Sequence, residues 1–460
     1  MRSAKSKVLH SVLGLPIIDH VINTVEQVGA KHKVVVVGHQ REAVTEHLAT
    51  YSGLQIAVQE TQNGTGHAVA VALASLPDSL QGSVLVLAGD APLVTQEDIQ
   101  RLAIAKQSSA VAILSAELTV PDGYGRIVRD ATGEVLKIVE HRDASDEELL
   151  ITEVNSGIYC FDLEQLRNAI DSIGSNNSQG EIYLTDAIEI IKHLGHPVQA
   201  VLTSSENILG INDRKQLAEV TDILRHRILD KWMLAGVTME DPATTWIETT
   251  VCLDQDVTLL PNVRLVGHTS VQSGAVIGPD CTLEDTRVLP RAKVIKATTI
   301  DSIIGEAAQV GPYAYLRPGT VLGTGAKAGG FVEMKNAQLG DQAKVPHLSY
   351  VGDAEIGEGT NIGAATIFVN YDGVQKHKTV VGKHVRIGSD TMLIAPVIIG
   401  DGAYTAAGSV ITEDVPAGAI GVGRSRQRNI LDWVLRRRPG SESAKAAVAD
   451  SGNNSSSVEG

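Results

Sequence analysis

The chain has 460 residues, of which 43% are hydrophobic and 20% charged, and its formal net charge is −15. This length excludes a small disulfide-held scaffold and is enough for two or three domains with large buried cores. The negative charge argues against broad binding to nucleic acids or anionic membranes, although small anions can still bind at local sites.

Residues 1–213 alternate short apolar runs with helix-like stretches. The apolar runs occur at 33–38, 83–90, 111–116 and 155–161. Such runs, separated by amphipathic segments, predict buried parallel strands with crossover helices. We therefore expect an α/β domain over 1–213. A linker helix over 214–236 is expected to follow, because RKQLAEVTDILRHRILDKWML has helical periodicity and lacks Gly and Pro.

The second half, expected as one domain over 237–430, repeats with a period of six residues. The anchors of this repeat form three series: Leu259, Leu265, Val271, Ile277, Leu283, Leu289 and Ile295; Ile304, Val310, Leu316 and Leu322; and Val381, Ile387, Leu393, Ile399, Thr405 and Ile411. This period lets three short strands close one triangular coil, and stacked coils then bury the anchors in a column. The low content of aromatic residues, with three Phe, nine Tyr and three Trp, also favours narrow aliphatic layers. The alternative is chance spacing in a Val-rich β-sandwich.

The cysteines and the first residues of the chain indicate the cellular compartment of the protein. Cys160, Cys252 and Cys281 show no CxxC spacing, which predicts reduced core thiols and a cytoplasmic protein. No apolar run approaches the ~18 residues of a membrane span, and the basic start lacks the apolar core of a signal peptide. Residues 431–460 are expected to be basic and then disordered, because the segment after Pro439 is small and polar.

Polar residues gather where the repeat is interrupted, around 313–318, 331–335 and 346–372. They include one histidine, His347, which is a candidate base because imidazole titrates near neutral pH. A lone histidine is more often structural, and cations usually lie on solvated faces. In the first half, Asp90 follows an apolar run and is expected at the carboxyl edge of the sheet, where ligands of α/β folds bind. A turn aspartate that caps the next helix is the alternative.

A family resemblance rests on longer motifs. The run HLSYVGDAEIGEGTNIGAATI followed by VNYDG, together with LRPG and FVEMK, resembles the bacterial bifunctional N-acetylglucosamine-1-phosphate uridylyltransferase/glucosamine-1-phosphate N-acetyltransferase family over residues 1–430. The resemblance implies a nucleotidyltransferase-like (Rossmann-like) α/β domain followed by a left-handed parallel β-helix of hexapeptide repeats. The hand comes from the resemblance, since the general rule for parallel crossovers favours the opposite one.

The resemblance also implies an assembly, substrates and site residues for acetyl transfer. We expect a homotrimer that uses acetyl-CoA and glucosamine-1-phosphate, with His347 as the general base. The residues that match sugar-phosphate ligands are Arg317 and Lys335, and those that match further contacts around the sugar are Tyr350, Asn361 and Lys376. Those that match acetyl-CoA contacts are Ala364, Asn370, Tyr371, Ser389, Ala407 and Arg424. Fixed cations suit a phosphate, because Arg offers a bidentate fork and Lys a point charge.

The first half is implied to transfer a uridylyl group from UTP to N-acetylglucosamine-1-phosphate. Asp90 and Asn212 match a Mg²⁺-holding pair, and a hard cation with oxygen ligands suits nucleotidyl transfer. The residues that match uridine contacts are Gln59, Gly64 and Thr65, and those that match contacts to the N-acetylglucosamine moiety are Gly125, Glu140 and Asn155. Lys7 and Asn212 are also expected to contact substrate.

One departure from the family pattern concerns the start of the chain. The apolar strand and the signature L-x-x-G-x-G-T-x-M do not occur, and Ser6-Lys7 stands where Pro-Lys is usual. Their loss is expected to leave neighbouring strands unpaired and uridylyl transfer weak or absent. We expect an internal start codon in a longer reading frame rather than a first domain that has lost its activity.

Three functions therefore stay open at this point. The chain is a bifunctional enzyme of UDP-N-acetylglucosamine synthesis, an acetyltransferase alone with an inactive first domain, or a non-catalytic assembly protein that uses the β-helix to form trimers. Coupled assays of CoA release and pyrophosphate formation distinguish them.

Overall fold

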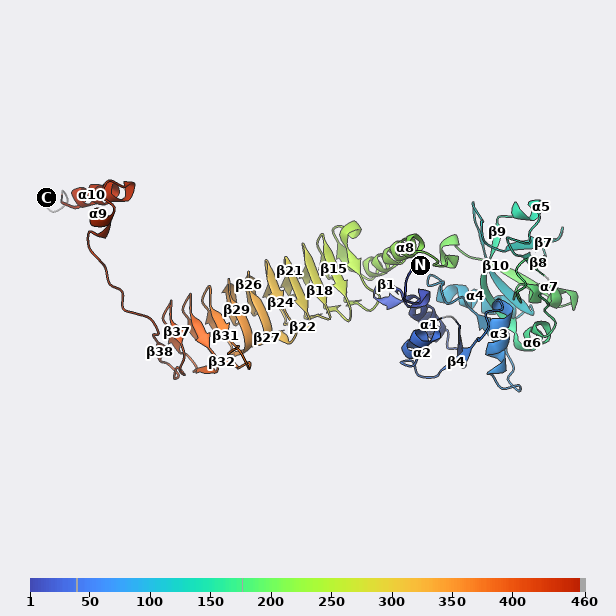
Figure 1. Cartoon of the computed structure of the whole chain (residues 1–460), viewed down its shortest axis with the longest axis horizontal. Coiled ribbons are helices and arrows are strands. Elements are labelled where there is room, and N and C mark those ends of the chain that lie inside the picture. The colour runs from blue at the N-terminus through green and yellow to red at the C-terminus, as the bar shows by residue number, and fades with distance from the viewer. Residues whose placement is uncertain (39, 176, 456–460) are drawn as a thin grey trace. The chain divides into compact units, whose positions relative to one another are not determined.

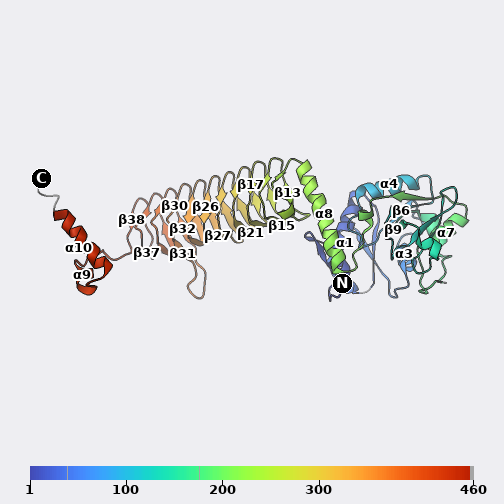
Figure 2. The same ribbon diagram turned by 90° about the horizontal axis from the view of Figure 1, so that it is seen from above.

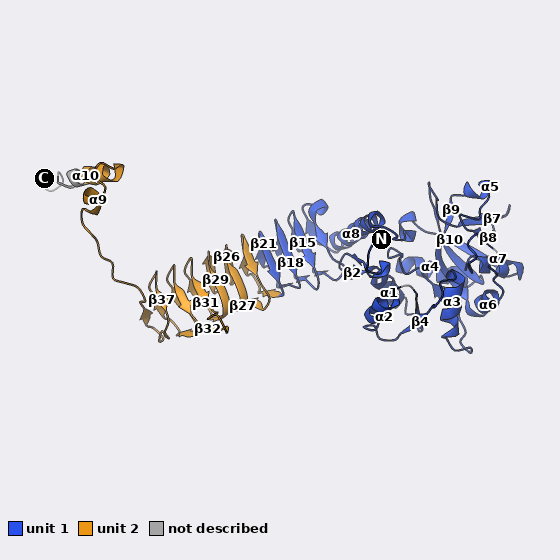
Figure 3. Cartoon of the chain, viewed as in Figure 1, with its two compact units in different colours: residues 1–301 blue, residues 302–460 orange. Residues whose placement is uncertain are grey.

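The structure is a computed structural model, and it describes every residue except 39, 176 and 456–460. The chain divides into two compact units, Met1–Asp301 and Ser302–Gly460, which are coloured separately in Figure 3. In the described residues, no helix combines the length and the apolar character that crossing a membrane requires.

The α/β part of the first unit holds the elements that position one candidate site. Its helices are η1 (Lys7–Leu9), α1 (Ile17–Gln27), α2 (Arg41–Leu48), α3 (Thr65–Ala74), α4 (Gln96–Lys106), α5 (Asp146–Leu149), α6 (Leu163–Ile170), α7 (Asp186–His193), η2 (Ser205–Ile208) and α8 (Arg214–Leu234). Its strands are β1 (Ser11–Val12), β2 (Leu15–Pro16), β3 (Lys33–Val37), β4 (Leu54–Val58), β5 (Ser83–Val86), β6 (Val111–Glu117), β7 (Arg126–Arg129), β8 (Val135–Val139), β9 (Glu153–Asp162) and β10 (Val198–Leu202).

A six-stranded sheet forms the middle layer, in the order β10-β6-β9-β7-β8, with β5 also paired to β9. Helices α3, α6 and α7 pack on one face, and α4 packs on the other (Figure 1). The prediction of strands at 111–116 and 155–161 is confirmed, but β9 runs antiparallel to both β5 and β6. The expectation that all these strands are parallel is therefore wrong for β9, because apolar composition reports burial and not strand direction.

The predicted strand at 33–38 lies in a separate two-stranded parallel sheet, β3-β4. Helices α1 and α2 cover this sheet through Ile22, Val44 and Leu48. Among the residues that the structure describes, no ladder joins β3 to β5. The helix predicted within the linker 214–236 is observed as α8, which ends at Leu234 and is capped at its start by the side chain of Asp213.

The first coils of a left-handed parallel β-helix complete this unit. Their elements are β11 (Thr238–Met239), η3 (Pro242–Thr244), β12 (Trp246–Ile247), β13 (Cys252–Leu253), β14 (Thr258–Leu259), β15 (Val263–Val266), β16 (Ser270–Val271), β17 (Val276–Ile277), β18 (Cys281–Glu284), β19 (Arg287–Val288), β20 (Lys293–Val294) and β21 (Ala297–Ile300). The anchors from Leu259 to Leu283 are buried, as predicted.

Two predicted anchors of the first series are wrong. Ile295 is 39% exposed and Leu289 is only partly buried, whereas the preceding residues, Val294 and Val288, are fully buried. Val271 pairs with Val288, seventeen positions later, so this coil is one residue shorter than three hexads. Because this coil is one residue shorter, the residue that points inward lies one position earlier than a constant spacing of six predicts.

The second unit continues the same architecture. Its elements are β22 (Ser302–Ile304), β23 (Gln309–Val310), β24 (Ala314–Leu316), β25 (Thr320–Leu322), β26 (Lys327–Gly330), β27 (Glu333–Leu339), β28 (Lys344–His347), β29 (Tyr350–Ile356), β30 (Asn361–Ile362), β31 (Ile367–Val369), β32 (Thr379–Val381), β33 (Arg386–Ile387), β34 (Met392–Ile394), β35 (Val397–Ile399), β36 (Tyr404–Thr405), β37 (Val410–Ile411), β38 (Ile420–Gly421), α9 (Trp433–Arg437) and α10 (Glu442–Ser455). All anchors of the second and third predicted series are buried. A long loop, residues 370–378, leaves the coil between β31 and β32 (Figure 2).

Two expectations about the rest of the chain need correction. The segment predicted as disordered forms α10. The hydroxyl of Ser441, just before this helix, accepts from the amide of Ala444, and Lys445 pairs with Glu442 within the helix. Its alanines favour a helix despite the polar composition; residues 456–460 lie outside the described part. Cys160 and Cys281 are buried free thiols, but Cys252 is exposed because it takes the outward position of its short strand.

Candidate active sites

The first candidate site centres on Lys7. Its Nζ lies 2.5 Å from Oδ2 of Asp90 and 3.0 Å from Oδ1 of Asn212. The strand predicted before Asp90 ends earlier, at Val86, and Asp90 lies in a turn. Asp90 is not the cap of the next helix, because Thr95 caps α4. The amide of Ile211 donates to the carbonyl of Asp90 at 3.1 Å, which holds the two oxygen-bearing side chains on adjacent segments.

The donor set at this point fits a hard divalent cation. A carboxylate oxygen and an amide oxygen, from Asp90 and Asn212, converge on one ammonium group. Mg²⁺ is commonly held by one or two such oxygens together with substrate phosphates. Within the described residues, no group of three or more His, Cys, Asp and Glu side chains offers a complete protein cage. A cation here would therefore depend on ligands from a substrate.

The start of α3 brings together the expected uridine contacts. Gly64 precedes the helix at φ +96°, and a Cβ atom there would lie 2.5 Å from the carbonyl oxygen of Ile182. Gln59 Nε2 donates to the carbonyl of Gly64 at 3.2 Å. The hydroxyl of the exposed Thr65 accepts from the amide of Leu184 at 3.1 Å. Glycine is thus required at residue 64 by both the backbone angle and the lack of space.

Glu140, Gly125 and Asn155 form a second cluster. The amide of Asn155 donates to the carbonyl of Gly125 at 2.9 Å, and a Cβ atom on Gly125 would lie 3.5 Å from Oε2 of Glu140. Burial raises the pKa of the Glu140 carboxyl, although a hydrogen bond from the Thr185 hydroxyl at 3.1 Å opposes the shift. The side-chain amide of Asn155 donates to the Tyr159 hydroxyl at 2.7 Å. The structure therefore brings these three predicted residues together.

Cations gather in the second unit because its strands stack in register. Residues 315, 333 and 350 occupy one row of neighbouring strands, and Lys335 pairs with Gly352 in the next outward row. The amide of Arg317 donates to the carbonyl of Met334 at 2.8 Å, which places Arg317 beside Lys335. The Arg317 guanidinium donates to Glu333 at 2.9 Å. This ion pair raises the pKa of Arg317.

Lys335 and Lys376 face each other across this surface. Contact with the Lys376 ammonium lowers the pKa of Lys335, and Arg317 adds to this effect. Asp353 lies close by, and its carboxylate accepts hydrogen bonds from the side-chain amides of Asn336 and Asn370. Burial opposes ionisation of Asp353, but these hydrogen bonds and the two lysines lower its pKa overall. Two facing ammonium groups are the arrangement that a dianionic phosphate stabilises.

The loop at 370–378 borders this cluster. The amide of His377 donates to the carbonyl of Asn370 at 2.8 Å, and the His377 ring lies 2.7 Å from the Asp372 carboxylate. Lys376 and His377 from this loop line a cavity of about 280 Å³ with Asn336, Asp353 and other residues of β27 and β29. Tyr371 is 56% exposed, and its hydroxyl donates to the carbonyl of Gly373. The expected sugar-phosphate and acetyl-CoA contacts thus meet at this loop.

Other expected acetyl-CoA contacts form a column on successive coils. The amide of Asp390 donates to the carbonyl of Ala364, and the amide of Gly408 donates to the carbonyl of Ser389. A Cβ atom on Gly388 would lie 2.5 Å from the amide nitrogen of Ala407. Small residues therefore keep this column narrow. The exposed side chain of Arg424 lies at its end, 3.8 Å from the Cβ position of Gly408.

His347 is exposed at the last position of β28. Its carbonyl accepts from the hydroxyl of Ser349 at 2.8 Å and from the amide of Ala365 at 3.3 Å, which fixes the corner that leads to Tyr350. Asn361 lies on the adjacent strand, paired with Lys344. In the described part of the chain, the hydrogen bonds and ion pairs do not join the His347 ring to the Lys335–Lys376 pair.

Sequence reasoning missed Asp353, Asn336 and Thr185, which contact predicted site residues. Asp353 adopts a positive φ of 49°. Asp285 and Asp301 do the same at other corners, at 46° and 41°, so an aspartate at such a corner does not by itself indicate a site. Thr185 precedes α7 and reaches Glu140 from 45 positions away. Only the folded chain reveals these contacts.

Comparisons with known proteins give the two halves a common identity. A model of the nucleotidyl transferase family matches residues 2–233, and a model of the bacterial transferase hexapeptide (six repeats) family matches residues 378–413. The bifunctional protein GlmU of Streptomyces griseus subsp. griseus is 52% identical over 456 residues, which cover 98% of this chain and 95% of that protein. The bifunctional protein GlmU of Rhodococcus opacus is 50% identical and covers 100% of this chain and 94% of its own length.

A solved nucleoside-diphosphate-sugar pyrophosphorylase from Vibrio cholerae RC9 is 17% identical and covers 48% of this chain and 93% of its own. Its TM-score is 0.40. The expected N-terminal truncation finds no support in the sequence alignments, which extend over nearly the full length of both partners. The nucleotidyl transferase match over residues 2–233 and the bifunctional relatives that cover the whole chain do not favour the alternative of an acetyltransferase alone.

Proposed function

This chain belongs to the bifunctional GlmU family, and we propose that it makes UDP-N-acetylglucosamine in two steps. The first step moves the acetyl group of acetyl-CoA to glucosamine-1-phosphate. The second step joins the uridylyl group of UTP to the N-acetylglucosamine-1-phosphate produced. The observation that carries this proposal is 52% identity to a bifunctional protein over 98% of the chain.

Acetyl transfer needs a base and a phosphate clamp. The sugar amine attacks the thioester carbonyl, the carbon–sulfur bond breaks, and CoA leaves as a thiolate, which takes up the proton that His347 has accepted. His347 accepts the proton that the amine loses, and its exposed ring is open to a substrate. Lys335, Lys376 and Arg317 hold the sugar phosphate, and Tyr350 and Asn361 contact the sugar. A bound phosphate offsets the repulsion between Lys335 and Lys376, which lowers the pKa of Lys335 in the free protein.

The acetyl-CoA contacts follow from the loop and the column described above. Asn370 and Tyr371 meet the acetyl end beside the sugar cluster, because the Asn370 amide is hydrogen-bonded to Asp353. The column of Ala364, Ser389 and Ala407 offers a narrow path along the coils toward Arg424, whose charge suits a CoA phosphate.

Uridylyl transfer uses the Lys7–Asp90–Asn212 cluster. A phosphate oxygen of the sugar attacks the α-phosphorus of UTP, and the bond to the β-phosphate breaks to release pyrophosphate. Gln59, Gly64 and Thr65 bind uridine, and Gly125, Glu140 and Asn155 bind the N-acetylglucosamine moiety. Asp90 and Asn212 would hold Mg²⁺, which neutralises charge on phosphate oxygens when bound. Lys7 places a further positive charge at the same point.

The chain is further proposed to act as a cytoplasmic homotrimer. The free thiols Cys160, Cys252 and Cys281 suit a reducing compartment. The division between the two activities is proposed at α8, with residues 1–213 serving uridylyl transfer and residues 237–430 serving acetyl transfer.

Paired assays on the whole chain test this function. Release of CoA from acetyl-CoA with glucosamine-1-phosphate reports the first activity, and release of pyrophosphate from UTP with N-acetylglucosamine-1-phosphate reports the second. Both are expected. CoA release alone would reduce the chain to an acetyltransferase, and neither product would leave only an assembly role.

A further inference from the structure

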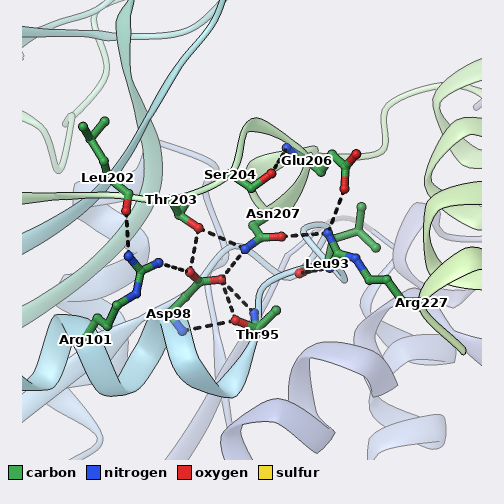
Figure 4. Close-up of polar contacts among 10 residues, drawn as sticks. All are labelled: Leu93, Thr95, Asp98, Arg101, Leu202, Thr203, Ser204, Glu206, Asn207 and Arg227. Carbon is green, nitrogen blue, oxygen red and sulfur yellow. Dashed lines mark hydrogen bonds and ion pairs between the residues drawn. The ribbon is translucent and has the colours of Figure 1, made fainter. Parts of the chain in front are cut away.

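Arg227 on α8 joins two segments that lead to the Asp90–Asn212 pair. Its Nη1 donates to the carbonyl of Leu93 at 2.9 Å, three residues after Asp90. Its Nη2 donates to Oδ1 of Asn207 at 2.7 Å, five residues before Asn212 (Figure 4). One planar guanidinium therefore binds both segments at once.

Asn207 is fixed in turn by Asp98. The side-chain nitrogen of Asn207 donates to Asp98 Oδ2 at 2.7 Å and to the Thr203 hydroxyl at 2.9 Å. The Asp98 carboxylate, whose side chain is 2% exposed, also accepts from Arg101 and Thr95. Burial opposes its ionisation, but hydrogen bonds from Thr203, Thr95 and Arg101 lower its pKa overall. An ionised carboxylate thus orients the Asn207 amide, so that its oxygen faces α8.

We infer that Arg227 is a positioning residue for uridylyl transfer, and that it sets the separation of the Asp90 carboxylate and the Asn212 amide. The inference rests on the proposed function of that pair. The rigid fork of Arg makes two hydrogen bonds in fixed directions, whereas Lys offers a flexible point charge. Groups that orient a metal-binding residue without touching the metal change its affinity by about 10- to 100-fold when replaced.

The test replaces Arg227 by Lys in the whole chain. UTP binding is measured by calorimetry at limiting and at saturating Mg²⁺, and uridylyl transfer is measured as a function of Mg²⁺ concentration. We expect R227K to weaken UTP binding by about tenfold at limiting Mg²⁺ and much less at saturation. The Mg²⁺ concentration for half-maximal transfer should rise by about the same factor. Acetyl transfer by the same sample should stay unchanged.

Arg225→Lys is the matched control. Arg225 lies on the same helix, but it donates to the carbonyls of Pro242 and Thr245 and to Asp222, away from both segments. Its replacement is expected to leave the Mg²⁺ dependence unchanged. Asn207→Ser is the second variant. It should shift the Mg²⁺ dependence in the same direction as R227K, and it decides the question if R227K does not fold.

The outcomes separate the inference from the function on which it rests. No uridylyl transfer by the unaltered chain would overturn the proposed function. An active unaltered chain with unchanged Mg²⁺ dependence in the folded variants would overturn the inference alone. A lower melting temperature with equal loss of UTP binding at both Mg²⁺ concentrations would assign Arg227 a structural role, which also overturns it.

Discussion

The ammonium of Lys7 lies 2.5 Å from the carboxylate of Asp90, although 83 positions separate the two residues in sequence. The same ammonium lies 3.0 Å from the side-chain oxygen of Asn212. Three residues that match one reaction thus meet at a point. Asp90 lies in a turn and Lys7 begins a 3-10 helix, so neither residue stands at the end of a strand.

Replacing Lys7 by Met tests the role of this cluster. The change removes the positive charge that faces the proposed transfer site, so uridylyl transfer should fall by about 100-fold. Acetyl transfer should stay at the level of the unaltered chain. Lys5→Met, at an exposed neighbour, is the control. An equal fall for both variants would indicate general damage at the N-terminal segment.

His347→Ala tests the base. Loss of the proton acceptor should lower the rate of acetyl transfer by about 100-fold or more. Because the His347 side chain is exposed, the melting temperature should not change. His268→Ala, at another exposed histidine of the coils, is expected to keep full activity. A normal rate for the His347 variant would remove this residue from the mechanism.

The lysine pair predicts a specific pH dependence. Lys376 lowers the pKa of Lys335, so Lys335 loses its proton at a lower pH than an isolated lysine would. As pH rises above neutral, binding of glucosamine-1-phosphate should therefore weaken at a lower pH than it would with an isolated lysine at this position. Lys376→Met should raise KM at neutral pH by about tenfold yet move this alkaline limb to higher pH. KM measured across pH checks both changes, and a limb that stays in place would contradict the assignment.

Glu140→Gln should affect stability and binding in opposite directions. Burial raises the pKa of Glu140 above its unfolded value, so its contribution to stability is complete below pH ~4.3 and is lost as pH rises through the folded pKa. At pH 7 the buried carboxylate therefore costs stability, and the neutral amide should raise the melting temperature. KM for N-acetylglucosamine-1-phosphate should rise by about tenfold. A lower melting temperature at pH 7 would refute the sign.

Alanine variants at two neighbouring isoleucines of β35 test which side chains point into the buried column of the β-helix. Ile399 is fully buried and Ile398 is 53% exposed. Ile399→Ala should lower the free energy of unfolding by about 3 kcal/mol, because it leaves a cavity in the column. Ile398→Ala should change it by less than about 0.5 kcal/mol. Chemical denaturation of both variants measures the difference, and equal effects would contradict the inward register.

The sequence by itself determined the architecture of the repeat. The anchors at every sixth position from Val381 to Ile411, which are aliphatic except for Thr405, are all buried, as expected when short strands and corners alternate with that period. The same spacing predicted the wrong inward residues at Leu289 and Ile295. The coil there is one residue shorter, which moves the inward position, and the composition of the segment does not show this. Apolar runs likewise located the strands at 111–116 and 155–161 but not their antiparallel pairing.

The sites were decided by the tertiary structure. Motifs could identify Asp90, Asn212 and Lys335 one at a time, but the contacts that bring Lys7 to Asp90 and Lys376 to Lys335 span 83 and 41 positions. Arg227 and Asp98 belong to no motif, and their hydrogen bonds join α8, the turn at Leu93, η2 and α4. Local periodicity reports which face of the chain is buried, whereas the charges and hydrogen bonds of a site depend on segments that meet only after folding.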